Sequence, residues 1–456
     1  MDGAAVVTGR RTATAAVLGA MAMVVLDAGM VGLALPSIAG ALGETPARSI
    51  MIVTAYQAAV LMALLPCAHV AERVGYRRLF GIGVGVFGFA SLLCALAPTL
   101  ELLVAARFVQ GLGGAAIMAL GIALLRFALG AERLGVAIAW NASVVAICAA
   151  AAPAAGALLL SIGQWPLLFL LGAPASAAIL FASRALPAVE PTSRSVDGLS
   201  MALYAAGAAL LVVAAGRAPM LAAALAAGAL LCLGWLAARE RRKQAPLLPL
   251  DLLALRPFRL SFAASIFFFA GQTAGLIALP FHLQLGLGHS ATAAGLVVTL
   301  WPVGVAAAGP LANRLAERVP ALCTAGGALL AAGLAAAASV PAAAGILPLA
   351  ACSLACGIGF GLFQVPNNRN LFLAVPAARS AAAGGMQGTA RLAGQTAGAL
   401  LVAWVLTAAP IALAPRLAFA AGAVAAVAAA WLSWRRDPAS RGSRARHLSG
   451  RSATPS

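Results

Sequence analysis

The chain is a succession of apolar stretches of about 20 residues, separated by short segments rich in Arg, Gly and Pro. A stretch of this length forms a helix long enough to cross the hydrocarbon core of a bilayer. With 63% hydrophobic and only 9% charged residues among 456, the chain cannot also cover the surface of a soluble protein. The sequence therefore predicts an all-α polytopic membrane protein with about fourteen transmembrane helices.

The formal net charge of +18 would favour nucleic acid as a partner of a soluble protein. Here the alternate loops and both tails hold most of the 30 Arg and Lys residues, as the positive-inside rule requires of cytoplasmic segments. The opposite loops hold only Arg48, Arg217 and Arg416. We therefore expect the bilayer and no nucleic acid as a partner, with both termini cytoplasmic. The Ala- and Arg-rich composition favours a bacterial source and thus the cell (inner) membrane.

The apolar stretches divide the chain into four parts. Residues 1–190 and 246–434 each predict a six-helix bundle, and residues 191–245 predict two inserted transmembrane helices and a linker, which leads through Pro246, Pro249 and Pro257 into the second half. Residues 435–456 form a basic tail. Two six-helix halves that share a central cavity are a transporter architecture, in which one half rocks against the other around a site in mid-membrane.

Asp27 is the only acidic residue deep inside an apolar stretch. An ionised acid at the centre of a membrane helix costs about 3 kcal/mol, and such residues are usually functional. Because desolvation disfavours the charged form, an acid in this setting can exchange a proton near neutral pH. The alternative is that Asp27 pairs with a neighbouring helix or reaches towards the interface.

Several segments resemble a known family in the expected order. They are Leu26–Pro36 in the first span, Glu72–Arg78 after the second and Arg107–Gly114 in the fourth. Residues 12–434 resemble the major facilitator superfamily, and within it the fourteen-span drug:proton antiporter branch. Two positions after the second span differ from the family pattern, Ala68 for Gly and Glu72 for Asp. The span-five antiporter pattern is poorly matched.

The resemblance implies that Asp27 binds the coupled proton and that Arg107 and Gln110 tune its affinity. For Arg107, snorkelling to the outer interface is the alternative. In the loop after span two, Gly75 permits a tight turn, and the resemblance implies a gate there. A similar segment follows the tenth span, which supports two repeated halves. The expected gating residues are Glu72, Arg73, Gly75, Arg77, Arg78, Asn313 and Arg314, and the residues that bend span five are Pro153 and Gly156.

Candidate walls of the cavity are aromatic and amide side chains, which suit amphipathic molecules. For each of them, ordinary helix packing is the alternative. They are Tyr56, Gln57, Trp140, Asn141, Phe268, Gln272, Trp301 and Gln364. The tenth span, 291–312, contains no carboxylate, so we expect neutral or monovalent cationic substrates. Arg391 is expected to be a packing and helix-capping cation near the cytoplasmic side.

These features predict a secondary active transporter that exports lipophilic drugs or toxic compounds in exchange for protons, by alternating access. Such multidrug efflux would confer antibiotic resistance. Export of one specific metabolite, antibiotic or siderophore is an alternative, and a membrane scaffold or sensor is another. Four dispersed histidines, without paired acids or a nucleotide-binding loop, argue against an enzyme. We expect no cofactor, no metal site, and a monomer whose partners are a small-molecule substrate and protons.

Overall fold

The computed structural model describes residues 2–187, 197–214, 219–240, 243, 247, 249–314, 319–375 and 379–436. These residues form helices and no strand. The helices are α1 (Asp2–Ala41), α2 (Pro46–Ser49), α3 (Met51–Val74), α4 (Tyr76–Ala95), α5 (Leu100–Leu129), α6 (Leu134–Ile162), α7 (Leu167–Leu170), α8 (Gly172–Ala182), α9 (Gly198–Ala214), α10 (Pro219–Glu240), α11 (Arg256–Phe281), α12 (Ala291–Arg314), α13 (Val319–Ser339), α14 (Leu347–Leu373), α15 (Ser380–Ala408) and α16 (Ala414–Trp434).

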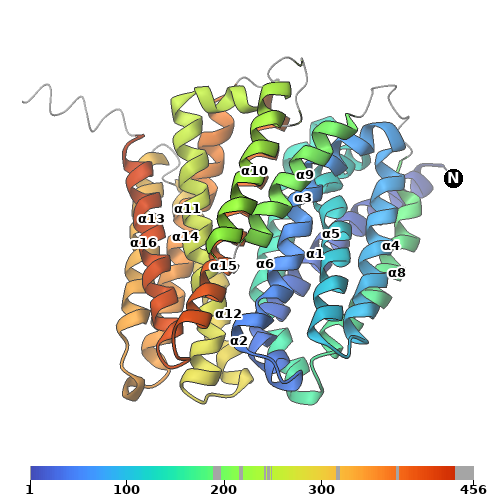
Figure 1. The fold of residues 1–456 in the computed structure, drawn as a ribbon. Helices are drawn as coiled ribbons and strands as arrows, with labels where there is room; N and C mark the ends of the chain where they lie inside the picture. Colours follow the sequence, from blue (N-terminus) through green and yellow to red (C-terminus); the bar gives the residue numbers. More distant parts are fainter. Residues whose placement is uncertain are drawn as a thin grey trace, which may run out of the picture.

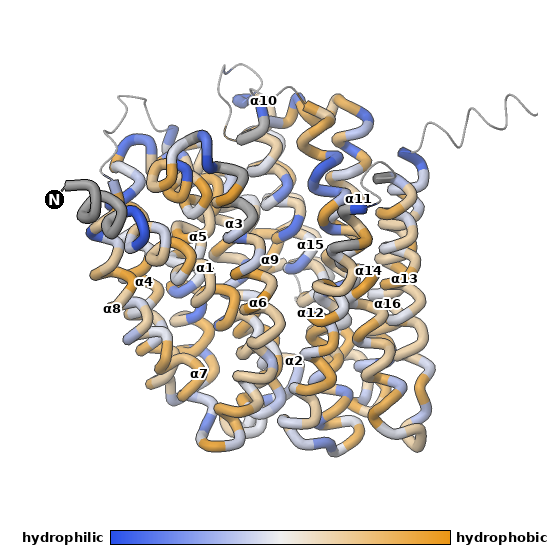
Figure 2. Tube along the Cα trace, turned by 180° about the vertical axis from the view of Figure 1, so that it is seen from behind, coloured by the Kyte–Doolittle hydropathy of each residue, from blue (hydrophilic) through white to orange (hydrophobic). Residues whose placement is uncertain are grey.

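Within the described ranges, twelve helices are long and apolar enough to cross a membrane. Helix formation satisfies the backbone polar groups that a bilayer cannot, and Figure 2 shows hydrophobic residues along the helices and most hydrophilic residues towards their two ends. The prediction of an all-helical, multi-pass membrane protein is confirmed. The fourteen-span count stays a prediction, because the twelve omit α15 and the shorter apolar helix α9.

The bundle has two distinct ends. The first residues of α1 and the last of α16 lie at one end, here called the tail end, and α2 lies at the other, the α2 end (Figure 1). Part of the predicted linker, including Pro246, and residues 437–456 of the predicted tail fall outside the described residues.

Helix packing repeats between the two parts of the chain. Helix α3 packs on α5 as α12 packs on α14, α4 on α5 as α13 on α14, and α1 on α6 as α11 on α15. The two halves meet mainly along two seams, α3 with α15 and α6 with α12. Helices α9 and α10 pack on each other, and α9 also packs on α3.

Among the described residues, the largest cluster of buried residues spans both halves towards the α2 end. There, Leu33 and Ile38 of α1 belong to the same cluster as Leu279 of α11. In addition, the side-chain amide of Gln284 donates to the carbonyl oxygen of Leu33 over 3.2 Å. Towards the tail end the buried residues form smaller, separate clusters. The largest of them consists mainly of residues of the N-terminal half and also includes Leu392 of α15. The halves are therefore joined more firmly at the α2 end.

A polar cluster fixes the ends of the inserted pair. Asp197 caps α9, because its carboxylate accepts from the backbone N–H of Ser200 over 3.1 Å and from its hydroxyl over 3.0 Å. Lys243 bonds both Asp197 and Glu240. Glu240, only 2% exposed, also accepts from Ser200 and from the backbone N–H of Leu247. The hydrogen bond from Lys243 holds the pKa of Asp197 well below its usual range.

Candidate functional site

Asp27 lies in the middle of α1 and is 5% exposed. Its Oδ2 accepts from Nη1 of Arg107 over 2.6 Å, and its Oδ1 accepts from Nε2 of Gln110 over 3.1 Å. Arg107 and Gln110 are three residues apart on α5, so they share one face of that helix. The structure therefore brings the three predicted proton-coupling residues together, in a buried ion pair with an amide beside it.

Arg107 is 1% exposed and is surrounded by groups that suit a cation. Its Nη1 also donates to Oε1 of Gln110, and its Nε donates to the carbonyl oxygen of Ile52 over 3.4 Å. Its Cζ lies 4.4 Å from the ring centroid of Tyr56 and 5.5 Å from that of Phe169. This burial excludes the alternative that Arg107 snorkels to the interface.

Helix α4 completes the network with two residues that sequence reasoning missed. Nε2 of Gln110 donates to Oγ of Ser91 over 2.8 Å, and that hydroxyl donates to the carbonyl oxygen of Phe87 over 2.8 Å. The thiol of Cys94 lies 3.9 Å from Oε1 of Gln110. Ser91 and Cys94 are three residues apart and therefore share one face of α4, and this spacing was the signal available in the sequence. The spacing does not show which neighbouring helix that face contacts.

Glycines on α5 permit this close assembly. A Cβ added at Gly111 would lie 2.5 Å from the carbonyl oxygen of Tyr56, and one at Gly113 would lie 2.6 Å from that of Gly83. Both contacts are with backbone and cannot be relieved by a side-chain rotation. The glycines that follow Gln110 therefore allow α3 and α4 to approach α5 closely enough for the network to form.

Helix α6 packs on α1 beside the acid. A Cβ at Gly29, two residues from Asp27, would lie 2.5 Å from Cβ of Ala152, and one at Gly156 would lie 3.1 Å from Cα of Met30. Pro153 lies inside α6 between these contacts. The predicted bend residues thus form part of the α1–α6 contact.

The predicted gating residues lie at the tail end, away from Asp27. Gly75, with φ of 98°, separates α3 from α4, and Nη1 of Arg77 donates to the carbonyl oxygen of Leu186 over 3.3 Å. Glu72 is half-buried. Arg73 and Arg78 are exposed on either side of Gly75. Arg314 is exposed in the last turn of α12, directly after Asn313.

Four of the predicted cavity residues carry buried polar atoms that have no hydrogen-bond partner among the described residues. These atoms are Oη of Tyr56, Oε1 of Gln57, Oδ1 of Asn141 and Nε1 of Trp301. They belong to α3, α6 and α12, which are helices of the two seams. Buried polar atoms are rarely left unpaired, so these atoms are available to a ligand or to water.

The other four predicted cavity residues are placed differently. Phe268 is fully buried and stacks on Phe363 with centroids 3.8 Å apart. Gln272, 9% exposed, accepts from the Thr273 hydroxyl over 3.4 Å. Trp140 is 49% exposed on α6, and Gln364 is half-buried on α14. The role of these four residues stays a prediction.

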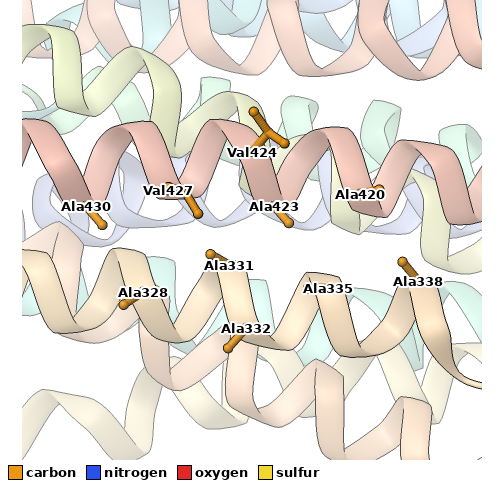
Figure 3. A pocket seen from close by; sticks show the side chains of 10 residues that line it. All are labelled: Ala328, Ala331, Ala332, Ala335, Ala338, Ala420, Ala423, Val424, Val427 and Ala430. Atoms are coloured by element: carbon orange, nitrogen blue, oxygen red, sulfur yellow. The ribbon is translucent and has the colours of Figure 1, made fainter.

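A groove of about 710 Å³ lies between α13 and α16 (Figure 3). Its lining consists of alanine and valine side chains alone: Ala328, Ala331, Ala332, Ala335, Ala338, Ala420, Ala423, Val424, Val427 and Ala430. Such a lining offers no side-chain donor or acceptor with which to orient a polar ligand. The candidate site is therefore the Asp27 network and the adjacent seams.

Curated relatives are transporters. The chain is 38% identical over 405 residues to the uncharacterised transporter YebQ of Escherichia coli K12, covering 85% of this chain and 87% of the relative. It is 26% identical to the riboflavin transporter RibZ of Clostridioides difficile, covering 81% and 82% of the two chains. It is 29% identical to the multidrug efflux pump LfrA of Mycolicibacterium smegmatis, covering 85% and 79%.

Solved structures and the family description agree with this relationship. A POT family transporter in complex with a thioalcohol-conjugated peptide has the same fold, with a TM-score of 0.72 at 14% identity over 92% of this chain and 94% of that one. The Major Facilitator Superfamily description matches residues 17–231 and 260–455. With these matches over most of its length, the chain belongs to the major facilitator superfamily.

Proposed function

We propose that this membrane transporter exports small lipophilic molecules in exchange for protons, as a monomer in the bacterial inner membrane with fourteen spans and both tails in the cytoplasm. The observation that carries the proposal is the buried pair of Asp27 and Arg107, which are 2.6 Å apart and lie inside a two-half transporter fold. An ion pair at this depth responds to a single proton, because protonation removes one of its two charges.

Protonation of Asp27 has a defined consequence in this geometry. The carboxyl group would lose its charge, and Arg107 would keep only uncharged acceptors, the Gln110 amide and the Ile52 carbonyl. A buried cation without a counter-ion costs several kcal/mol. The protonated network therefore favours a rearrangement of α1 against α5, and this rearrangement is the proposed link between proton binding and the exchange of conformations.

The uneven joining of the two halves supports alternating access. Towards the α2 end the two halves share one large buried cluster, and towards the tail end a single residue of α15, Leu392, joins the cluster of the N-terminal half. With the tails in the cytoplasm, this arrangement corresponds to a state closed towards the outside. A proton that enters from outside would neutralise Asp27 and release substrate outward, and its loss to the cytoplasm would restore the ion pair. Each charge that crosses the membrane contributes about 2.3 kcal/mol per 100 mV.

The proposal predicts that Asp27→Asn abolishes proton-driven transport without preventing membrane insertion, because an amide of similar size cannot take up the coupled proton. Uptake of labelled lipophilic cations, neutral antibiotics and organic anions into energised everted vesicles measures it, with and without a proton uncoupler. Asp251→Asn is the matched control, because Asp251 is exposed and bonds Arg379 far along the chain. Undiminished gradient-driven uptake in Asp27→Asn would contradict the coupling role.

Transport of a single metabolite is a second candidate function. Its support is the similarity to a protein named as a riboflavin transporter. Competition among many unlabelled compounds for uptake of one substrate distinguishes the two, since a multidrug exporter is inhibited by many compounds and a dedicated one by few.

A further inference from the structure

Arg391 occupies a position that the proposed proton-coupling step does not use. It lies about three turns inside α15, which begins at Ser380. The expectation that it caps a helix is therefore wrong, because it is too far from either end of α15. A Cβ at Gly388, one turn earlier, would lie 3.0 Å from Leu64 of α3, and one at Gly394, one turn later, would overlap the carbonyl oxygen of Ile266 of α11. Arg391 therefore lies between the face of α15 that contacts α3 and the face that contacts α11. In agreement, Arg391 interacts electrostatically with Tyr56 of α3.

Among the described residues, no carboxylate forms an ion pair with Arg391, and Tyr56 is its one titratable neighbour. Arg391 is partly buried. A guanidinium in the middle of a membrane-spanning helix, without a counter-ion among the described residues, is unfavourable unless a ligand or water supplies acceptors.

Three other polar atoms on α3 and α15 are buried and have no hydrogen-bond partner in the part of the chain that the structure describes. They are Oη of Tyr56 and Oε1 of Gln57 on α3, and Oγ1 of Thr396 on α15. Tyr56 is only 6% exposed, and its ring also lies against Arg107. Both halves of the protein therefore contribute polar groups without a partner near this seam, the cation from α15 and a hydroxyl and an amide from α3, and the Tyr56 hydroxyl lies on the side of α3 that faces Gly114 of α5.

The charges at this site favour one chemical class of ligand. Arg107 neutralises Asp27, which leaves Arg391 as the uncompensated charge between α3 and α15. Its planar fork matches the two oxygens of a carboxylate or sulfonate. A bound cation would instead be repelled by Arg391 and would meet no free acid.

We propose that the seam between α3 and α15 is a binding site for an organic anion, with an aromatic body and a carboxylate or sulfonate group held by Arg391. Tyr56 and Gln57 bind the polar edge of the same molecule from the opposite half. This site deepens the proposed export function, and it replaces the expected neutral or cationic substrates by anionic ones. Because Tyr56 contacts both ligand and Arg107, the ligand would also touch the Asp27 network.

A pair of probes that differ in one group tests the proposal. They are 8-anilinonaphthalene-1-sulfonate and its uncharged counterpart, N-phenyl-1-naphthylamine. Binding of each to the full chain in nanodiscs is measured by equilibrium dialysis, with empty nanodiscs subtracted and no pH gradient. We expect the wild type to bind the sulfonate more tightly than the amine, and Arg391→Gln to weaken sulfonate binding by about tenfold or more, as loss of one charge-assisted bond implies. Binding of the amine should change by less than about twofold.

Two further variants make the result specific. Arg391→Lys keeps the charge but not the planar guanidinium, so its affinity for the sulfonate should lie between those of the wild type and Arg391→Gln. Arg416→Gln removes a half-buried arginine that binds the Val340 carbonyl and should leave both affinities unchanged. Should Arg391→Gln not fold, wild type and Arg391→Lys carry the same comparison.

Equal wild-type affinities for the two probes would overturn the anion site, as would a folded Arg391→Gln that binds the sulfonate normally or loses both probes alike. Because no gradient is used, each of these results leaves the proton-coupling role of Asp27 untouched. Conversely, gradient-driven uptake that survives in Asp27→Asn would end the coupling proposal without affecting this site.

Discussion

At the scale of single residues, the buried pair of Asp27 and Arg107 dominates the molecule. The family resemblance implied that Arg107 and Gln110 act on Asp27, and the structure places both against the acid. Ser91 and Phe169 could not be predicted in the same way, because their contribution depends on how α4 and α7 are rotated against their neighbours. Tyr56 was predicted as a cavity wall, and its second contact with Arg107 emerges only in three dimensions.

The pair also makes a prediction about stability. Arg107→Gln leaves Asp27 buried without a counter-ion and should lower the free energy of unfolding by about 3–5 kcal/mol. Arg107→Gln combined with Asp27→Asn removes both charges and should cost much less than the sum of the two single changes. Thermal unfolding of the purified variants in detergent measures this coupling. Additive effects would show that the two side chains do not interact in the folded protein.

At the scale of elements, the contacts between helices are set by small residues. Apolar stretches are enough to predict the helices of a membrane protein, and the glycines after Gln110 are residues that permit close contact between helices. The partners of these glycines were not predictable, because any apolar helix can accept a glycine face. The structure assigns Gly111 to α3 and Gly113 to α4.

We therefore expect Gly111→Ala to impair both folding and transport. Its Cβ would overlap the carbonyl oxygen of Tyr56, so α3 must move away from α5 and from the guanidinium of Arg107. Gly32→Ala in α1 is the matched control, because nothing lies within 4 Å of the added Cβ. The two variants are compared by yield of folded protein and by uptake into everted vesicles. Equal behaviour of the two would contradict the assigned contact.

At the scale of the whole molecule, the repeated packing of the two halves followed from the sequence more readily than the placement of the inserted pair. An apolar pair between two bundles can lie against either half. The structure packs α9 on α3, where Leu203 and Tyr204 form a buried cluster with Leu65. The ends of the pair are held by Asp197 and its partners.

The pKa of Asp197 gives this attachment a pH dependence. Because the hydrogen bond from Lys243 lowers its folded-state pKa, Asp197 stabilises the fold above its unfolded-state pKa of about 3.9. This contribution is lost as the pH falls below that value towards the folded-state pKa. Asp197→Asn should therefore increase hydrogen exchange in α9 and α10 at pH 7, and the difference from wild type should shrink below about pH 4. A difference that persists in acid would contradict the role of this carboxylate.

The inserted pair also makes the outer surface of the transporter unequal on its two sides. Helix α9 packs on α3, and its Tyr204 lies beside Thr389 of α15, so the pair covers the α3–α15 seam on the side that Figure 1 shows in front. The related α6–α12 seam has no such cover among the described helices. For a solute dissolved in the lipid, the α3–α15 seam is thus covered and the α6–α12 seam is accessible. Lateral entry from the bilayer therefore has a preferred side.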